Sequence, residues 1–479
     1  MKNNSSLPMP VRARPYLHQQ NAFDFCCSQF GLADGRVKSR GTALLMEMGC
    51  GKTLVGVGVT GILYQHDLVH RVLVVAPLSV LSVWEEEYAR FAHYPYGLTV
   101  LSGSCENKAG ILRGLQPGGL QIVLVNYESA WRIKDSILAF KPDLIIADEA
   151  HKLKDSKSRQ SKAMHEIADR AKFRMLLTGT VITNKELDVF SQYRFLNRDI
   201  FGTSFYAFRN RYFDMVGYGN HIPRFRQSML DDFLERMHSV AFRVTKDECL
   251  DLPDITEETR VIDLEPKARK MYDTLMKESF AELARGEVSA VNVLTKTLRL
   301  SQLTGGHITD DDGVSHEVST AKLSALEDIA DSVLDEGKKL VVIARFVPEL
   351  DSIEALLEKK GIGYAVIRGG VNNRDEEINR FQNDPDCRVF VGQISAAGLG
   401  ITLTAASTMV FYSLSYSMSD FEQAKARIHR VSQTEKCHYI YLIAKNTVDR
   451  KVLRALKNKQ DLAKALVDDY RRGLNPFNN

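Results

Sequence analysis

The sequence contains few cysteines, and their spacing excludes the common cysteine-rich classes of protein. Its seven cysteines are an odd number, none form a CxxC pair, and the adjacent Cys26 and Cys27 cannot bridge each other without strain. This spacing fits neither a disulfide framework nor a structural zinc site. We therefore expect reduced thiols in a cytosol-like compartment.

The sequence also lacks the apolar segments that secretion or membrane insertion needs, and it lacks an excess of one charge. Its start, MKNNSSLPMPVRARPYL, has no apolar core, and its longest apolar runs are far below membrane-spanning length. Lys and Arg number 63 against 60 Asp and Glu. We expect no membrane partner, and a nucleic-acid partner would need basic residues that are concentrated locally.

Short apolar, β-branched runs are present, and they alternate with helical patterns in two parts of the chain. Such runs are typical of strands buried on both faces of a parallel sheet, so the alternation predicts doubly wound α/β domains. The runs lie at 42–46, 71–77, 121–127, 143–148 and 173–179, and then at 339–345, 364–369, 387–393, 408–413 and 437–444. We expect one lobe over 1–250, with a helical insertion at about 185–250, and a second over 251–479, helical at about 265–335.

The stretch GCGKT, from Gly49 to Thr53, follows one apolar run and opens a helical pattern. This is the context of a phosphate-binding loop, in which backbone N–H groups and a helix N-terminus attract phosphate. Lys52 would reach the β- and γ-phosphates of ATP, and the Thr53 hydroxyl would hold Mg²⁺. Because the chain has Met46 where the pattern has glycine, a glycine-rich turn with a surface lysine is the alternative.

Two adjacent acidic residues follow another apolar run, in the sequence DEAH at 148–151. They lie at the carboxyl edge of a predicted buried strand, where open α/β sheets bind ligands. Asp148 would hold Mg²⁺ through water, and Glu149 would orient or activate the attacking water. A DEAH sequence alone also fits a solvated helix start, but its place downstream of the glycine-rich loop favours one nucleotide site.

Two further patterns fit around such a site, and each has a structural alternative. The LLTGT sequence ends a predicted strand with Thr178 and Thr180, whose hydroxyls suit the sensing of metal-bound carboxylates, or form a polar strand end. RPYLHQQ at 14–20 offers a ring that could stack on a base and an amide that could read its edge. The alternative for this segment is a packed N-terminal helix.

A glycine-rich block at 395–408 precedes the basic segment QAKARIHRVSQ at 423–433. The glycines allow close approach of a ligand or of another backbone segment. Arg427 and Arg430 are three residues apart on one face of a predicted helix. Arginines delivered across a cleft onto a γ-phosphate stabilise transition-state charge and make hydrolysis depend on domain closure. The alternative is a solvated basic helix face.

The motifs GxGKT, AP at 76–77, DEAH, TGT, GLGITLT and QAxxRxHRxxQ, in this order, resemble those of the Swi/Snf-type ATPases among the superfamily-two helicases. The resemblance covers about residues 14–455. It implies two RecA-like lobes with ATP between them and DNA across both. It implies ATP contacts at Tyr16, Gln19, Gly49, Cys50, Gly51, Lys52, Thr53 and Gly400, and a catalytic set of Lys52, Asp148, Glu149, Gln423, Arg427 and Arg430. It also implies metal ligands Thr53 and Asp148 and coupling residues His151, Thr178 and Thr180.

The resemblance also implies where DNA binds. SVLSVW at 79–84 and NYE at 126–128 resemble first-lobe motifs near the DNA path, and IRGGVNNRDEEINRF at 367–381 resembles a second-lobe stretch with a backbone-contacting loop. NTVDRKVL at 446–453 matches the usual closing motif of the family. The DNA contacts expected from the resemblance as a whole are Pro77, Ser79, Asn126, Arg345, Gly369, Gly370 and Gln393.

The chain departs from the family pattern at three positions. It has Ala426 where the family usually has Asp, Val181 where it usually has Pro, and Met46 where it usually has Asp. None of these positions is a phosphate, metal or cleft-arginine ligand, so the prediction of an enzyme stands. The departures bear on the coupling between the lobes and on the turnover rate.

Basic residues are concentrated in the segment 190–226, which has six arginines, two acidic residues and eleven aromatic residues, and hence a local net charge of +4. Arginines suit phosphates and aromatic rings can stack on unpaired bases, so Arg209 and Arg211 are candidate DNA contacts. A small aromatic core with solvated arginines explains the composition equally well.

These patterns predict a DNA-dependent ATPase that uses ATP and Mg²⁺ and moves along double-stranded DNA as a monomer. The chain resembles the short forms of the family found in bacteria and their viruses, which places it in a bacterial or phage-infected host cytoplasm. One alternative is a strand-separating helicase on DNA or RNA. Another is an ATP-gated clamp that binds DNA and recruits or remodels a protein partner with little translocation.

Overall fold

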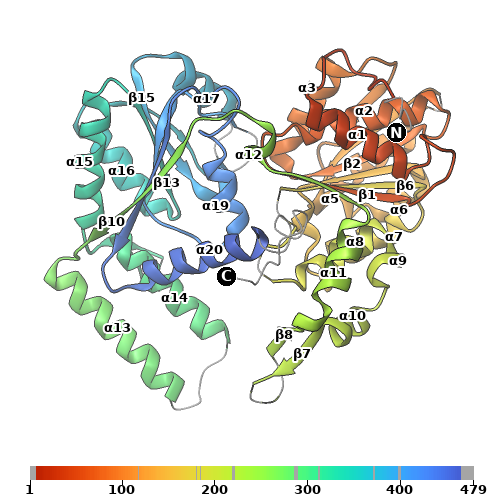
Figure 1. Cartoon of the computed structure of the whole chain (residues 1–479). Helices are drawn as coiled ribbons and strands as arrows, with labels where there is room; N and C mark the ends of the chain where they lie inside the picture. The colour runs from red at the N-terminus through yellow and green to blue at the C-terminus, as the bar shows by residue number, and fades with distance from the viewer. Residues whose placement is uncertain are drawn as a thin grey trace. The chain divides into compact units, whose positions relative to one another are not determined.

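The computed structural model describes most of the chain, which divides into two compact units. Unit 1 covers the chain up to Leu250, and unit 2 runs over Asp251–Gln460 (Figure 1). The described residues are 7–116, 118–179, 181–183, 185–217, 219, 222–284, 290–310, 313–370, 373–397 and 401–464, with side chains described except at 278–294, 396–397 and 461–464. Of the helices in these ranges, none combines the length and the apolarity that crossing a membrane requires.

Unit 1 is built on a sheet of seven strands in the order β3-β4-β2-β5-β6-β1-β9, and every neighbouring pair is parallel. The strands are β1 (Gly41–Met46), β2 (Arg71–Ala76), β3 (Gly97–Val100), β4 (Gln121–Asn126), β5 (Leu144–Asp148), β6 (Phe173–Leu177) and β9 (Ala241–Val244). The predicted parallel α/β fold is confirmed. The apolar runs are continuous because successive side chains enter two cores: Ala43 and Leu45 face one, and Leu44 and Met46 the other.

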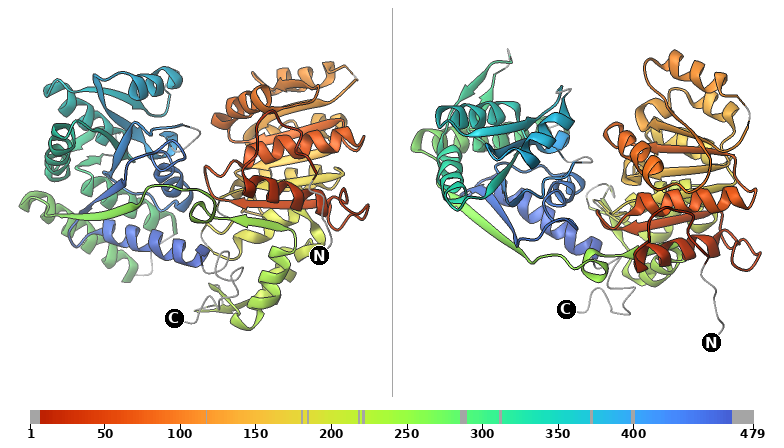
Figure 2. Two further views of the ribbon diagram at one scale, coloured as in Figure 1. Left: turned by 45° about the horizontal axis from the view of Figure 1, so that its top comes forward. Right: turned by 90° about the horizontal axis from the view of Figure 1, so that it is seen from above.

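Helices cover both faces of this sheet, as the turned views show (Figure 2). They are α1 (Leu17–Gln29), α2 (Lys52–Gln65), η1 (Leu78–Val80), α3 (Leu81–Phe91), α4 (Cys105–Gly114), α5 (Tyr127–Ala130), α6 (Lys134–Phe140), η2 (Ala150–Leu153) and α7 (Arg159–Ala168). Residues of α1, α2 and α3 pack in one of the two cores, and residues of α4 to α7 pack in the other. The loops at the carboxyl ends of the strands therefore lie along one edge of the sheet.

The arginine- and aromatic-rich segment forms a helical subdomain with its own hairpin. Its elements are α8 (Asp188–Leu196), α9 (Arg198–Phe201), α10 (Phe205–Tyr212), β7 (Phe213–Val216), β8 (Ile222–Phe225), η4 (Gln227–Met229) and α11 (Leu230–His238), followed by α12 (Lys246–Cys249). The β7–β8 hairpin extends away from the sheet of unit 1 (Figure 1).

Most of the aromatic rings in this segment form a core. Phe190, Tyr193, Phe195, Phe201, Phe208, Tyr212, Phe213 and Phe225 are all buried in one apolar cluster. Stacking on bases is therefore the wrong interpretation for these rings, because burial among apolar side chains stabilises them there. Tyr206, on α10, is an exception with 60% of its surface exposed.

Unit 2 is built on a second parallel sheet, of six strands in the order β10-β17-β16-β13-β15-β14. The strands are β10 (Ile255–Ile262), β13 (Lys339–Ala344), β14 (Gly363–Ile367), β15 (Cys387–Gln393), β16 (Ala406–Phe411) and β17 (Cys437–Ala444). The helices are α13 (Pro266–Ala284), α14 (Ala290–Thr304), α15 (Ala321–Asp335), α16 (Val347–Lys359), α17 (Arg374–Asn383), α18 (Ile394–Ala397), α19 (Met418–Lys425) and α20 (Val448–Lys464), with a hairpin of β11 (His307–Thr309) and β12 (Ser315–Glu317).

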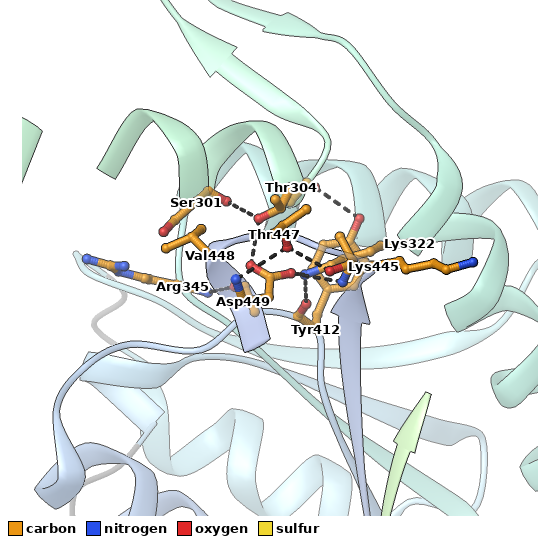
Figure 3. A network of polar contacts seen from close by, with 12 residues as sticks. Ser301, Thr304, Lys322, Arg345, Tyr412, Lys445, Thr447, Val448 and Asp449 are labelled. Atoms are coloured by element: carbon orange, nitrogen blue, oxygen red, sulfur yellow. Dashed lines mark hydrogen bonds and ion pairs between the residues drawn. The ribbon is translucent and has the colours of Figure 1, made fainter. Parts of the chain in front are cut away.

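A buried polar network ties the start of α20 to two other helices of unit 2. Lys322 Nζ, on α15, lies 2.7 Å from Asp449 Oδ2 and donates to the Tyr412 carbonyl at 3.1 Å (Figure 3). Thr304 Oγ1, at the end of α14, donates to Asp449 Oδ1 at 2.7 Å. Asp449 belongs to the closing motif NTVDRKVL. Separating the elements that supply the two charges of a buried ion pair is costly, because each charge would lose its partner while buried.

Candidate functional site

The glycine-rich loop joins β1 to α2 at the carboxyl edge of the unit 1 sheet. Gly49 and Gly51 have φ values of 89° and 78°, and Gly51 is the N-cap of α2. The positive φ favours glycine at Gly51, and a Cβ there would lie 2.1 Å from Gln19 Nε2, so the Gln19 side chain would have to move away from the loop. Lys52 is buried, and its Nζ donates to the carbonyls of Met46 at 2.8 Å and Glu47 at 3.3 Å. A surface lysine, the alternative interpretation, does not describe this residue.

Helix α1 packs directly on this loop. His18 Nε2 and Gln19 Nε2 lie 2.9 and 3.4 Å from the Cys50 carbonyl, and Gln19 Oε1 accepts a hydrogen bond from the Tyr16 N–H at 2.9 Å. The Tyr16 ring stacks on His18 with centroids 5.8 Å apart and is 56% exposed. The amide of Gln19 thus lies at the loop, and the ring of Tyr16 presents a free face.

Asp148 is the last residue of β5, and its carboxylate is buried and held from several sides. Oδ2 accepts a hydrogen bond from Trp84 Nε1 at 2.9 Å, and Oδ1 accepts one from the Glu149 N–H at 2.8 Å. Its backbone carbonyl accepts a hydrogen bond from the Tyr127 hydroxyl at 2.7 Å. Burial, together with the neighbouring Glu149 charge, raises the pKa of Asp148 to about 6 against the opposing effect of Lys52.

Glu149 turns the chain sharply at the end of β5. Its φ of 48° is left-handed, a conformation that costs a residue with a side chain about 1–2 kcal/mol. His151 Nδ1 lies 3.3 Å from Glu149 Oε2. All four residues of DEAH are buried, and the last two begin the short helix η2, so the solvated helix start is the wrong interpretation of this motif.

The TGT sequence follows β6, which lies between β5 and β1 in the sheet. Thr178 is fully buried, and its N–H donates to the Leu44 carbonyl of β1 at 3.2 Å. This topology brings the ends of β1, β5 and β6, with Lys52, Asp148 and Thr178, to one sheet edge. Thr180, predicted to act with Thr178, lies outside the described residues.

Two residues at this edge were missed by the sequence analysis as parts of the nucleotide site. Trp84 was assigned only to a segment near the DNA, whereas its indole N–H contacts Asp148. Arg243, on β9, donates to the Leu45 carbonyl at 3.1 Å, to the Gly179 carbonyl at 3.3 Å and to Glu47 Oε1 at 3.1 Å. No local pattern marks Arg243, because β9 lies in a segment predicted to be helical.

The first-lobe residues expected to contact DNA gather at the same end of neighbouring strands. Pro77 is the N-cap of η1, directly after β2, and Asn126 ends β4, where it pairs with Ala76. Ser79 Oγ and Asn126 Oδ1 are both buried and make no hydrogen bond with a described residue. Buried polar atoms of this kind are costly unless a ligand or water satisfies them.

Arg209 and Arg211 lie on α10, on the surface of the aromatic core. The Arg209 guanidinium lies over the exposed Tyr206 ring, 5.2 Å from its centroid, and Nη2 donates to Asn210 Oδ1 at 3.3 Å. Arg211 Nη2 instead lies 2.9 Å from Asp232 Oδ1. The charge of Arg211 is therefore partly balanced within the protein.

In unit 2, Arg427 and Arg430 do not lie on a helical face, and that expectation is wrong. Helix α19 ends at Lys425, and both arginines lie in the turn that follows. Arg427 Nη1 and Arg430 Nη1 donate to the Ile401 carbonyl at 3.2 and 3.0 Å. The turn is fixed by tertiary hydrogen bonds, including those from Gln433 Nε2 to the carbonyls of Ala406 and Ile428 at 2.9 and 3.1 Å.

Gln423, also predicted to act in catalysis, is buried within α19. Arg430 Nη1 makes a second hydrogen bond, to Thr402 Oγ1, at 2.7 Å. The glycine-rich block therefore meets the two arginines at Ile401 and Thr402. Gly400, predicted to contact ATP, lies outside the described residues.

Three of the four second-lobe residues expected to contact DNA are linked by one side chain. Gln393 Oε1 accepts a hydrogen bond from the Gly369 N–H at 3.0 Å, and Gln393 Nε2 donates to the Arg345 carbonyl at 3.4 Å. Gly370, next in the chain, has a φ of 89° and open space where a Cβ would be. Burial lowers the pKa of Arg345, whose guanidinium lies 4.9 Å from the Phe346 ring centroid.

Comparison with known proteins gives the same order of parts. An SNF2-related domain matches residues 18–305, and a helicase conserved C-terminal domain matches residues 321–432. An uncharacterized ATP-dependent helicase of Mycoplasma genitalium is 26% identical over 435 residues, which are 90% of this chain and 40% of that protein. The mouse chromodomain-helicase-DNA-binding protein 1-like is 28% identical over 446 residues, 88% of this chain and 47% of that protein.

A DNA repair and recombination protein RAD54-like of Drosophila persimilis is 24% identical over 510 residues, 95% of this chain and 64% of that protein. The chain thus spans about two-fifths to two-thirds of these relatives. Among solved structures, the Sulfolobus solfataricus SWI2/SNF2 ATPase core in complex with dsDNA is 24% identical with a TM-score of 0.47, covering 97% of this chain and 95% of that one. Because the SNF2-related domain matches more than half of its residues, this chain belongs to the SNF2-related family.

Proposed function

We propose that the protein hydrolyses ATP with Mg²⁺ and uses the energy to move along double-stranded DNA, remodelling DNA or protein–DNA complexes. The observation that carries the proposal is the edge of the unit 1 sheet. There the buried Lys52, which opens α2 after the glycine-rich loop, lies at the same sheet edge as the buried carboxylates of Asp148 and Glu149 at the end of β5. ATP-dependent helicases among the relatives support the same activity.

The residues at this edge fit a magnesium ion bound with the nucleotide. The Asp148 carboxylate and the Thr53 hydroxyl supply hard oxygen ligands, and the raised pKa of Asp148 indicates a carboxylate that a cation would stabilise. When bound, Mg²⁺ supplies positive charge to the phosphate oxygens. Thr53 and Asp148 would hold it.

The residues of unit 1 divide the work of hydrolysis. Lys52 exchanges its two carbonyl partners for the β- and γ-phosphate oxygens, which the N–H groups of the Gly49–Gly51 loop also bind. Glu149 orients the attacking water and accepts its proton, and His151 fixes the Glu149 carboxylate. Tyr16 and Gln19, beside the loop, contact the base.

Unit 2 supplies the charge that makes hydrolysis depend on DNA. Arg427 and Arg430 stabilise the γ-phosphoryl group in the transition state. Thr178 and Thr180 couple this state to the DNA-binding loops. The unpartnered Ser79 hydroxyl, which can donate, and the Arg345–Gln393–Gly369 cluster bind the DNA backbone, whereas Asn126 Oδ1, which can only accept, contacts the backbone through a bridging water. Relatives named for DNA binding and for DNA repair support DNA as the partner.

Strand separation is a second candidate function, and one observation favours it. The β7–β8 hairpin extends from unit 1, and Ile222 on β8 is 60% exposed, as an apolar side chain that parts base pairs would be. Translocation alone needs no such element.

Hydrolysis and movement can be tested together. Phosphate release is measured without nucleic acid and with single-stranded DNA, duplex DNA or duplex RNA, and movement is measured as displacement of a triplex-forming strand. Stimulation by duplex DNA with triplex displacement supports translocation, whereas unwinding of a forked duplex supports strand separation. Stimulated turnover without either movement indicates an ATP-gated clamp. A lack of stimulation by any nucleic acid contradicts the proposal.

A further inference from the structure

We propose that Trp84 is a positioning residue for the metal site: its indole N–H fixes the Asp148 carboxylate in the orientation that binds Mg²⁺. This inference rests on the proposed function, because it assigns Asp148 as a metal ligand. It gives a residue of the SVLSVW segment a place in the nucleotide chemistry of unit 1.

The hydrogen bonds to Asp148 set the rotation of its carboxylate at both ends. Trp84 Nε1 donates to Oδ2 at 2.9 Å, and the Glu149 N–H donates to Oδ1 at 2.8 Å. Each carboxylate oxygen can accept more than one hydrogen bond or ligand, so lone pairs stay available on both oxygens. The Glu149 donor belongs to the backbone, and Trp84 is therefore the side chain that holds this group in one orientation.

The sequence builds a close-fitting place for the Trp84 ring. The ring is fully buried on α3, and it lies against α2 at Gly56, where a Cβ would come within 2.9 Å of Trp84 Cη2. Its neighbour Tyr88, with ring centroids 6.0 Å apart, places its hydroxyl 3.1 Å from Thr60 Oγ1 on α2. Because α2 begins at Lys52, one helix both carries the phosphate lysine and holds the ring against Asp148.

A hydrogen-bond partner behind a metal ligand tunes the metal site without touching the metal. Loss of such a partner typically lowers metal affinity or activity about 10- to 100-fold. Trp84→Phe keeps an aromatic ring in the cavity and removes the N–H. We expect it to weaken metal binding about 10-fold and to leave metal-free nucleotide binding unchanged.

The test is direct metal binding, with Mn²⁺ as the probe. Electron paramagnetic resonance of free Mn²⁺, titrated with protein and ADP, gives the metal affinity of wild type, W84F and Y88F. The Y88F control removes the neighbouring hydroxyl from Thr60 in the same core and touches no carboxylate. We expect W84F alone to weaken Mn²⁺ binding, and equal affinity in W84F and wild type would overturn the proposal. An equal loss in both variants would also overturn it, as an effect of core packing.

Asp148→Asn separates this inference from the proposed function. If D148N binds Mn²⁺ as tightly as wild type does, the metal assignment itself is wrong. If D148N loses the metal and W84F retains it, the assignment stands and Trp84 is only a core residue.

A second measurement keeps the native ring in place and covers the outcome that W84F does not fold. The sequence has two tryptophans, Trp84 and Trp131, so W131F leaves Trp84 as the sole indole. Mn²⁺ quenches nearby indole emission. We expect quenching of Trp84 by Mn²⁺ with ADP in W131F and its loss in the W131F/D148N double variant. Emission that does not respond to Mn²⁺ would overturn the proposal, and an equal response in both proteins would overturn the metal assignment on which it rests.

Discussion

The two units place their predicted catalytic side chains by different means. In unit 1, Asp148 ends a buried strand and Lys52 opens the helix that follows another, so the chain itself sets their positions. In unit 2, Arg427 and Arg430 lie in a turn beyond the end of α19 and are held by the Ile401 carbonyl. The positions of side chains at strand ends thus follow from the assembly of the sheet. The positions of the two arginines depend instead on contacts between segments far apart in the sequence.

The loop lysine gives the largest expected effect and tests the unit 1 side of this comparison. Lys52→Ala should abolish ATP hydrolysis and leave unit 1 folded, because the loss of two hydrogen bonds from a charged group, each worth about 1.5–3 kcal/mol net, is offset by no longer burying an ammonium. Phosphate release with saturating duplex DNA, beside a thermal melt, checks this. Glu149→Gln is the matched control: it should bind ATP and fail to hydrolyse it. Near-normal turnover in K52A contradicts the phosphate-loop assignment.

The arginines test the unit 2 side. Arg430→Ala should remove most of the DNA-stimulated turnover, roughly a thousandfold as for other arginines that act on a γ-phosphate. Arg430→Lys should restore little, because an ammonium cannot reproduce the planar fork of a guanidinium.

Arg427→Ala is the comparison variant for Arg430. Arg427 is 4% exposed, whereas Arg430 is only partly buried, so R427A should lower the melting temperature as well as turnover. Melting curves and both hydrolysis rates, basal and stimulated, separate the two roles. If R430A lowers stability and both rates in parallel, Arg430 is structural.

The sequence could predict the parts of the fold whose side chains face two cores. Runs such as that of β5 are buried along their whole length, so apolar continuity alone predicts a parallel sheet. The edge strand β10 was missed because most of its residues are exposed, and its sequence ITEETRVI has little apolar pattern. The strand β9 was missed because it has only four residues and directly follows a helical segment. The sequence therefore predicts the whole of that segment to be helical.

The candidate site likewise divides into residues that a local sequence pattern predicts and contacts that it does not. Lys52 and Asp148 could be placed because a glycine-rich loop and an acidic pair at strand ends have local signatures. The contact between Trp84 and Asp148 joins residues 64 apart in sequence, and that between Arg243 and Glu47 joins residues 196 apart. No pattern within one segment encodes such pairs, because they exist only after the sheet has assembled.

The buried ion pair of unit 2 tests how far stability in that unit depends on distant contacts. Lys322→Ala leaves the Asp449 carboxylate buried beside Thr304 without its cation, which should lower the free energy of unfolding by about 3 kcal/mol. Urea denaturation followed by circular dichroism measures this. Lys360→Ala is a matched control, since Lys360 pairs with Glu327 and Asp331 at the surface and should contribute under about 1 kcal/mol. Equal losses in both variants would contradict the role of the buried network.

The smallest expected effect concerns the arginines on α10, which differ within one helical turn. Arg209 lies over the exposed Tyr206 ring, whereas Arg211 pairs with Asp232, which also accepts hydrogen bonds from Arg236 and Tyr212. If both bind phosphate, each should contribute about 0.9 to the slope of log affinity against log salt. Arg209→Glu should therefore flatten the slope by about that amount without changing stability.

Arg211→Glu should behave differently, because it places a second carboxylate against Asp232. We expect R211E to weaken DNA binding less than R209E does and to lower the melting temperature more. Hydrolysis without DNA should be unchanged in both variants. Fluorescence anisotropy with labelled duplex DNA at several salt concentrations, beside melting curves, measures both terms. An unchanged slope in R209E would identify Arg209 as solvated surface. If the salt slope falls equally in both variants and neither loses stability, Arg211 exchanges Asp232 for phosphate when DNA binds. If Arg211 kept its ion pair with Asp232, it would have no free charge to contribute to DNA binding.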